Sequence, residues 1–174
     1  GAAVIFGATG GVMEAALRTA YEIVTGREVP FSNLNITPVR GMDGVKEASV
    51  KIEGCLPEWK FLEGAELKTA IGHGLVNANK IMKKVRDGKA PWHFIEIMAC
   101  PGGCIGGGGQ PIPTSMEIRK KRMKAIYSED ESMKIRKSHE NPDVVAIYKE
   151  FLEKPNSHKS HELLHTHYTE RDDY

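Results

Sequence analysis

The segment EIMACPGGCIGGGGQP, residues 96–111, contains two cysteines separated by three residues. The Pro-Gly-Gly turn between Cys100 and Cys104 bends the chain so that both thiols can face one point. The four glycines at 106–109 bring peptide N–H groups close without a Cβ in the way, as a bulky anionic inorganic group requires. The pattern therefore favours thiolate ligation of a metal cluster.

Three explanations of the cysteine pair remain open from the residues alone. Two buried or disulfide-bonded cysteines are the ordinary alternative. Zinc sites usually repeat the cysteine pair or add histidines at matching spacing; neither pattern is present, although Cys-x3-Cys alone would allow zinc. An iron–sulfur cluster needs about four thiolates, and Cys55 is the only other cysteine. A cluster of this kind would take its remaining ligands from outside this chain.

The segments around the cysteine pair predict an α/β fold, part of a mixed or parallel sheet with flanking helices. The apolar run HFIEIMA, residues 93–99, predicts a strand that leads into the cysteine loop, and EASVKIEG, residues 47–54, predicts another. Ala3–Phe6 predicts a buried strand before the tight GATGG loop. Two helices are expected, one over 72–90 with an apolar face and one that ends at Gly26. Their apolar positions are Leu75, Ala78, Met82 and Val85 in the former and Val12, Ala16, Ala20, Ile23 and Val24 in the latter.

The character of the chain changes after Pro113. Thr114 and Glu117 form a capping box that predicts a charged helix. Asn141, followed by a proline at the first helical position, predicts the start of the next helix. The apolar faces of these helices are too narrow for a separate core, so we expect them to wrap the α/β part. The predicted domains are 1–113 and 114–174.

Composition restricts the class of protein. The 174 residues carry a formal net charge of +1, which gives no electrostatic reason to expect a nucleic-acid partner, and no apolar run has the length of a membrane span. An odd number of cysteines and no visible secretory signal favour a reducing, cytoplasmic location. The first residues predict a core strand without an initiator Met, so we expect the chain to be the C-terminal part of a longer polypeptide.

Several stretches resemble one family. EIMACPGGCIGGGGQP resembles the third cysteine signature of the iron–iron hydrogenases, in which Met-Ala-Cys is followed by three residues, a second Cys and a glycine-rich Gln-Pro end. VIFGATGGVMEAALRTAYE, residues 4–22, resembles a second stretch of that family, and HGLVNANKIM and the helical tail also fit. The resemblance covers nearly the whole chain. The family's first two cysteine signatures are absent from it.

The resemblance implies an H-cluster, in which a 4Fe–4S cubane is joined through one cysteine sulfur to a di-iron unit with CO, cyanide and a bridging dithiolate. Cys100 would ligate the cubane, and Cys104 would ligate the cubane and bridge to the di-iron unit. Met98 would pack beside the di-iron ligands. The same pocket would be lined by Phe6, Gly7 and Val12.

The resemblance also implies a function in anaerobic hydrogen metabolism. The chain is expected to belong to a hydrogenase that interconverts H2 with protons and electrons, which it exchanges with ferredoxin or an NAD(P)H-linked partner subunit. The rest of the hydrogenase polypeptide or complex would be a further partner. Two alternatives remain: a hydrogenase-like iron–sulfur assembly protein that has a cluster but no H2 activity, and a slowly turning hydrogen sensor.

Other features have weaker functional interpretations. GATGG lacks the Lys-Ser/Thr of a phosphate-binding P-loop and the spacing of a dinucleotide fingerprint, so we expect a loop that closely approaches the cluster. Glu96 could relay protons, but a structural role is favoured. Cys55 is expected to be a packed or surface thiol. His161 and His165 could hold a metal ion, although charged terminal helices usually remain solvated.

Overall fold

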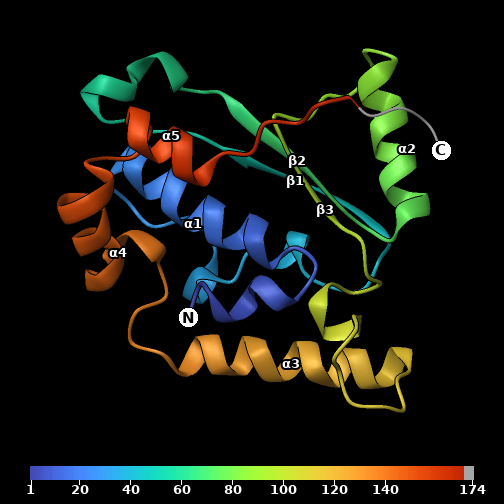
Figure 1. Cartoon of the computed structure of the whole chain (residues 1–174). Helices are drawn as coiled ribbons and strands as arrows, with labels where there is room; N and C mark the ends of the chain where they lie inside the picture. The colour runs from blue at the N-terminus through green and yellow to red at the C-terminus, as the bar shows by residue number, and fades with distance from the viewer. Residues whose placement is uncertain (171–174) are drawn as a thin grey trace. The chain divides into compact units, whose positions relative to one another are not determined.

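The computed structural model describes residues 1–170, which form two compact units, Gly1–Ser138 and a second that begins at His139. The first unit is an α/β structure, as predicted (Figure 1). Its principal elements are α1 (Gly11–Thr25), β1 (Val45–Lys51), β2 (Glu66–His73), α2 (Leu75–Arg86), β3 (Phe94–Met98) and α3 (Met116–Ser132).

The three strands form one mixed sheet in the order β1-β2-β3. β1 is antiparallel to β2, with Val45 opposite Gly72. β3 is parallel to β2, and the register places Met98 opposite His73 at the ends of the two strands. Since the carboxyl ends of parallel strands meet at the same edge, the loop after β3 begins beside the end of β2.

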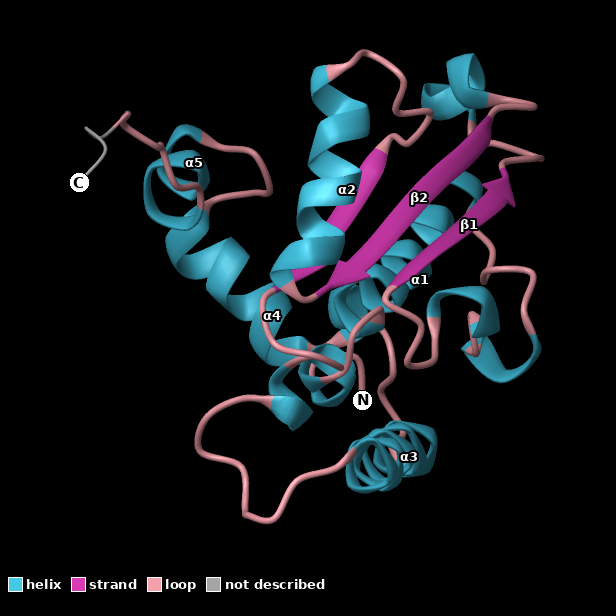
Figure 2. Ribbon diagram, turned by 90° about the vertical axis from the view of Figure 1, so that its right-hand side faces the viewer, coloured by secondary structure: helices cyan, strands magenta, loops and turns pink. Residues whose placement is uncertain are grey.

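The helices α1 and α2 cover opposite faces of this sheet (Figure 2). Met13 and Leu17 of α1 join Ile71 of β2 in the main apolar core. On the other face, a Cβ at Gly72 would lie 2.6 Å from the side chain of Ile81 in α2. Neighbouring residues of a strand point to opposite faces, so β2 is covered on both sides.

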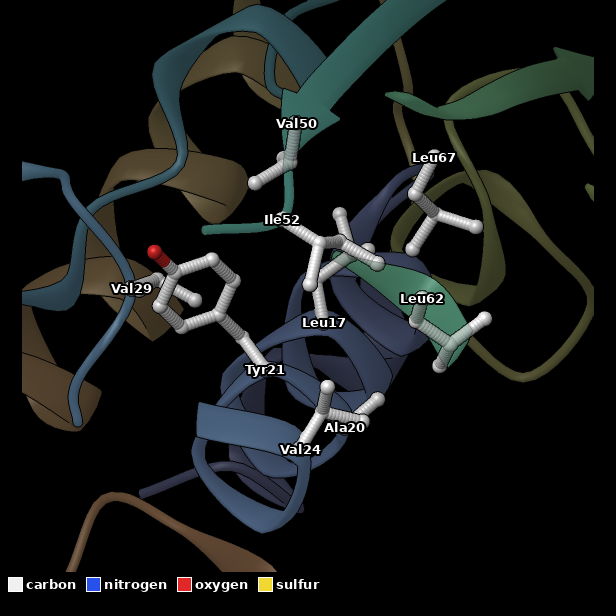
Figure 3. A pocket seen from close by; sticks show the side chains of 9 residues that line it. All are labelled: Leu17, Ala20, Tyr21, Val24, Val29, Val50, Ile52, Leu62 and Leu67. Carbon is white, nitrogen blue, oxygen red and sulfur yellow. The ribbon is translucent and has the colours of Figure 1, made fainter. Parts of the chain in front are cut away.

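An apolar cavity of about 230 Å³ lies between α1 and the sheet (Figure 3). Leu17 and Tyr21 of α1 face Val50 and Ile52 across it, and Leu67 of β2 adds a further wall. None of its lining residues belongs to the cysteine loop or to the predicted site. The cavity is therefore a feature of the core rather than the place where the cysteines act.

A buried ion network connects α1 to α3. Arg18 donates to the two carboxylate oxygens of Asp130 at 3.0 and 2.9 Å and to Glu14 at 2.6 Å. Arg136 donates to Asp130 at 2.8 Å, and Arg40 donates to both oxygens of Glu14 at 2.8 and 2.6 Å. The network fixes α3 to the α/β part, which agrees with the predicted wrapping for this helix.

The expected face of the first helix needs correction. The helix itself is confirmed and ends at a glycine in the left-handed conformation. Val24 is buried as predicted, but Ala20 and Ile23 are exposed, and the inward face carries Met13 and Leu17 instead. The reason is the buried ion network, because its two charged residues on α1 occupy inward positions that the hydrophobic pattern assigned to solvent.

Two other predictions from the sequence were wrong, and one strand was not predicted. Residues 3–6 do not form a strand; Val4–Gly7 is a 3-10 turn in which only Ile5 is buried. The central strand β2 was missed because its first half is charged and its end was assigned to the following helix. The expected apolar face of that helix is largely exposed, with Leu75 at 73% and Met82 at 44%, and Ile81 is the buried residue.

The helices after Pro113 begin close to the predicted positions. The side chain of Ser115, rather than Thr114, accepts a hydrogen bond from the Ile118 N–H and caps α3. In the second unit, Asn141 caps α4 (Pro142–Ile147) as predicted, by accepting from the Asp143 N–H. The chain continues as a π-helix, Tyr148–Leu152, and then as α5 (His158–Leu164).

The division at 113/114 stays a prediction. Among residues 1–170, no helix combines the length and the apolar character that a bilayer span needs.

Candidate functional site

The cysteine loop, defined here as residues 99–111, runs from the end of β3 towards α3 (Figure 1). Cys100 is half-buried, Cys104 is exposed, and both are free thiols. Two tight turns shape the loop: the Gly103 N–H donates to the Cys100 carbonyl, and the Gly107 N–H donates to the Cys104 carbonyl, each at 3.0 Å. The backbone hydrogen bonds therefore place both cysteines in a tightly turned loop, with both thiols free.

The cysteine loop rests against the GATGG loop that precedes α1. The Thr9 N–H donates to the Gly102 carbonyl at 3.0 Å. A Cβ at Gly103 would lie 2.7 Å from the Gly7 carbonyl oxygen, 2.8 Å from the Thr9 nitrogen and 2.8 Å from the Met98 sulfur. Only glycine permits this approach, and Gly103 has a φ of 93°. The structure thus brings the predicted site residues Gly7 and Met98 to the loop that carries both cysteines.

Ile105 and the predicted site residues Phe6 and Val12 differ in exposure. Ile105 is buried in an apolar cluster with Ile5 and Met123, so one side of the loop is dry. Phe6 is 44% exposed, and Val12 lies half-buried in the first turn of α1. The apolar cluster around Ile105 covers one side of the loop. Phe6 and Cys104 remain exposed and can contact another protein segment or a cofactor.

Glu96 holds the start of α1 beside the cysteine loop. Its carboxylate accepts hydrogen bonds from the Gly10 N–H at 2.6 Å and from the Met13 N–H at 2.7 Å. These N–H groups belong to the helix N-terminus, where a negative charge is favourable. Both oxygens are engaged with backbone, which agrees with the structural role that was favoured for this residue.

Lys46 forms a hydrogen bond with the GATGG loop and His73 forms one with the cysteine loop, and both residues were missed from the sequence. The Lys46 ammonium donates to the carbonyls of Thr9 and Gly41 at 3.0 and 2.9 Å. Burial lowers its pKa to about 8, although the charge of Glu96 opposes this. His73 Nδ1 accepts from the Gly102 N–H at 3.0 Å, so its proton lies on Nε2, which faces the Met42 carbonyl at 3.2 Å.

Two arginines of α3 contact the cysteine loop, and these too were not predicted. Arg122 donates to the carbonyls of Ile105 and Pro111 at 2.9 and 2.7 Å. Arg119 lies against the loop at Gly106, where a Cβ would be 2.8 Å from its Nε atom. The hydrophobic periodicity of the sequence does not indicate these contacts, because the two arginines lie among several solvent-exposed lysines.

The residues present fit an iron–sulfur cluster as a partial ligand set. A Cβ at Gly107 would lie 3.1 Å from the Cys100 sulfur, so the glycine leaves open space beside that thiol. Cys55 lies in a different loop, where its N–H donates to Glu63 at 2.9 Å. This chain therefore offers two cysteines in one loop, about half of what a cubane needs.

Two family models together match most of the chain. The sequence matches the family described as iron only hydrogenase large subunit, C-terminal domain, over residues 1–108, and the family described as iron hydrogenase small subunit over residues 116–171. It is 51% identical to the NADP-reducing hydrogenase subunit HndD of Solidesulfovibrio fructosivorans over 98% of this chain and 27% of that protein. The chain thus spans about a quarter of the length of this relative.

Solved structures show the same likeness. A variant of the FeFe-hydrogenase HydA1 from Chlamydomonas reinhardtii matches with a TM-score of 0.74 and 44% identity, over 94% of this chain and 45% of that one. The protein NAR1 of Arabidopsis thaliana is more distant, at 29% identity over 94% of this chain and 33% of that protein. The chain belongs to the iron-only hydrogenase family, in which it corresponds to the C-terminal domain of the large subunit followed by the small-subunit sequence.

Proposed function

We propose that this chain is the C-terminal part of the catalytic subunit of an iron–iron hydrogenase, which interconverts two protons and two electrons with H2. The observation that supports this most directly is the close approach at Gly103, which brings the loop that carries both cysteines against Gly7 and Met98. The higher identity to an NADP-reducing hydrogenase than to NAR1 favours the enzyme over a hydrogenase-like iron–sulfur assembly protein.

In this proposal, Cys100 and Cys104 would hold a 4Fe–4S cubane as thiolates, and Cys104 would also be a ligand of the di-iron unit. The H-cluster, when bound, supplies the redox chemistry of hydrogen and receives its remaining ligands from outside this chain. Met98, Phe6, Gly7 and Val12 line the same site. Ile105 keeps water from one side of the loop, and the surrounding glycines let backbone N–H groups approach the sulfurs.

The partners and the location are part of the same proposal. Electrons are exchanged with ferredoxin or with an NAD(P)H-linked subunit, a choice that the name of the NADP-reducing relative favours. A cytoplasmic location is supported by the odd number of cysteines, all of which are free thiols. Residues 1–113 would form the H-cluster part and residues 114–174 the small-subunit-like part.

The test is Cys104→Ser in the intact, matured protein, with Cys55→Ser as the matched control. Cys104→Ser is expected to abolish H2 evolution and to remove the infrared bands of bound CO and cyanide, whereas Cys55→Ser should retain both. H2 evolution at the parental rate in Cys104→Ser would contradict the bridging role. An intact parent protein with iron and sulfide but no CO or cyanide bands would instead support the assembly-protein alternative.

A further inference from the structure

The side chain of Arg119 in α3 packs against the cysteine loop. A Cβ at Gly106 would lie 2.8 Å from the Nε atom and 3.1 Å from the Cδ atom of Arg119, and a Cβ at Gly102 would lie 3.8 Å from Cδ. The residue is half-buried, so its stem covers loop backbone. The side chain is therefore held between the helix and the segment that carries both cysteines.

One hydrogen-bond donor of Arg119 lacks an acceptor within the part of the chain that the structure describes. Its Nε–H is buried and has no hydrogen-bond acceptor. One turn further along α3, Arg122 donates to two loop carbonyls at 2.9 and 2.7 Å. A buried donor is nearly always paired, and an arginine offers five donors and a permanent charge. The contrast suggests that Arg119 is placed for an anionic group that these residues do not supply.

The contacts of two neighbouring glycines set an upper limit on the distance between Arg119 and Cys100. Gly107 follows Gly106 directly, and a Cβ at Gly107 would lie 3.1 Å from the Cys100 sulfur. Since adjacent Cα atoms are about 3.8 Å apart, the Arg119 Nε atom and the Cys100 Sγ atom are separated by about 13 Å at most. Over such a distance a half-buried charge still interacts with a group bound at Cys100, because salt screens partly buried charges less than charges exposed on the surface.

We propose that the positive charge of Arg119 raises the reduction potential of the iron–sulfur cluster that Cys100 and Cys104 would hold. The inference rests on the proposed function for the presence of the cluster. Reduction adds one electron to a group that is already anionic, so a nearby cation stabilises the reduced form more than the oxidised form. Net charge and hydrogen bonding to sulfur are recognised determinants of cluster potential.

The experiment compares Arg119→Gln and Arg119→Lys with the parent in the intact, iron-loaded protein. The midpoint potential of the 4Fe–4S cluster is measured by redox titration followed by electron paramagnetic resonance. Arg119→Gln is expected to decrease the ratio of reduced to oxidised cluster about tenfold at a fixed potential, a shift of about 59 mV for one electron. Arg119→Lys keeps the charge and should remain close to the parental potential.

Lys120→Gln is the matched control, because it removes a charge from the adjacent, exposed position of the same helix. It should leave the midpoint potential unchanged. An unchanged potential in Arg119→Gln, or an equal shift in Lys120→Gln, would overturn the proposal. If Arg119→Gln retains too little iron to titrate, Arg119→Lys decides the matter, because a lowered potential despite the conserved charge would contradict it. Absence of CO and cyanide bands in the parent would instead count against the proposed function.

Discussion

Arg18 on α1 and Asp130 on α3 bind each other through two hydrogen bonds, of 3.0 and 2.9 Å, with both side chains fully buried. The residues stand 112 positions apart in the sequence. Because removing one partner leaves the other charge buried and uncompensated, Asp130→Asn is expected to lower the free energy of unfolding by about 3–5 kcal/mol. Denaturant titration of the intact protein measures this, and Glu129→Gln, at an exposed neighbouring position, should change stability by less than about 0.5 kcal/mol.

The same pair predicts a loss of stability in acid. Burial alone would raise the pKa of Asp130, but hydrogen bonds from Arg18 and Arg136 outweigh it and lower this pKa from 3.8 to about 2. The folded pKa is below the unfolded one, so the stabilisation is present above pH 3.8 and is lost as the pH falls through about 2. Asp130→Asn should show a shallower decline of stability over this window than the parent; equal slopes would contradict the prediction.

Lys46 predicts a gain of stability in alkali. Burial lowers its pKa from 10.5 to about 8, so above pH 8 the unfolded chain binds more protons than the folded chain. The contribution of Lys46 to stability should therefore rise by about 1.4 kcal/mol per pH unit between pH 8 and 10. Lys46→Met should remove this increment in denaturant titrations at several pH values. A parallel rise in the variant would assign the effect to other groups.

Glu96→Ala is expected to destabilise the start of α1. The change removes both acceptors for the N–H groups of Gly10 and Met13 and a negative charge at the helix N-terminus. The expected cost is about 2 kcal/mol of unfolding free energy. Glu117→Ala is the control, because its ion pair with Lys121 is exposed and worth less than about 1 kcal/mol. Similar losses in the two variants would show that the Glu96 contacts add nothing beyond those of a surface residue.

Gly103→Ala tests the close approach of the two loops. Both Gly103 and Gly109 have positive φ, 93° and 85°, so an alanine at either position costs about 1–2 kcal/mol of backbone strain. Only at Gly103 would the new Cβ also collide with backbone, whereas at Gly109 nothing lies within 4 Å. Gly103→Ala should therefore reduce bound iron per chain strongly, and Gly109→Ala should retain it. Equal iron contents would mean that the close approach is not required for the site.

The features that depend on neighbouring residues in the chain were predictable from the sequence. A strand followed by Cys-Pro-Gly-Gly-Cys indicates a loop at a strand end, and the glycines around Cys104 indicate close backbone approach. The supports of that loop were not predictable, because Lys46, His73 and Arg119 act through long-range contacts that leave no periodic signal. The paired charges of α1 misled the assignment of its inward face for the same reason, since a buried ion pair has the composition of a solvated surface.

The buried network between α1 and α3 also has a consequence for assembly. One polypeptide carries both the large-subunit sequence and the small-subunit sequence, joined through residues 109–115. The contact between Arg18 and Asp130 therefore forms at a high effective concentration that the connecting segment sets, independent of how much protein is present. Were the two sequences separate chains, the same charges would have to find each other by diffusion, and dilution alone could expose them to water.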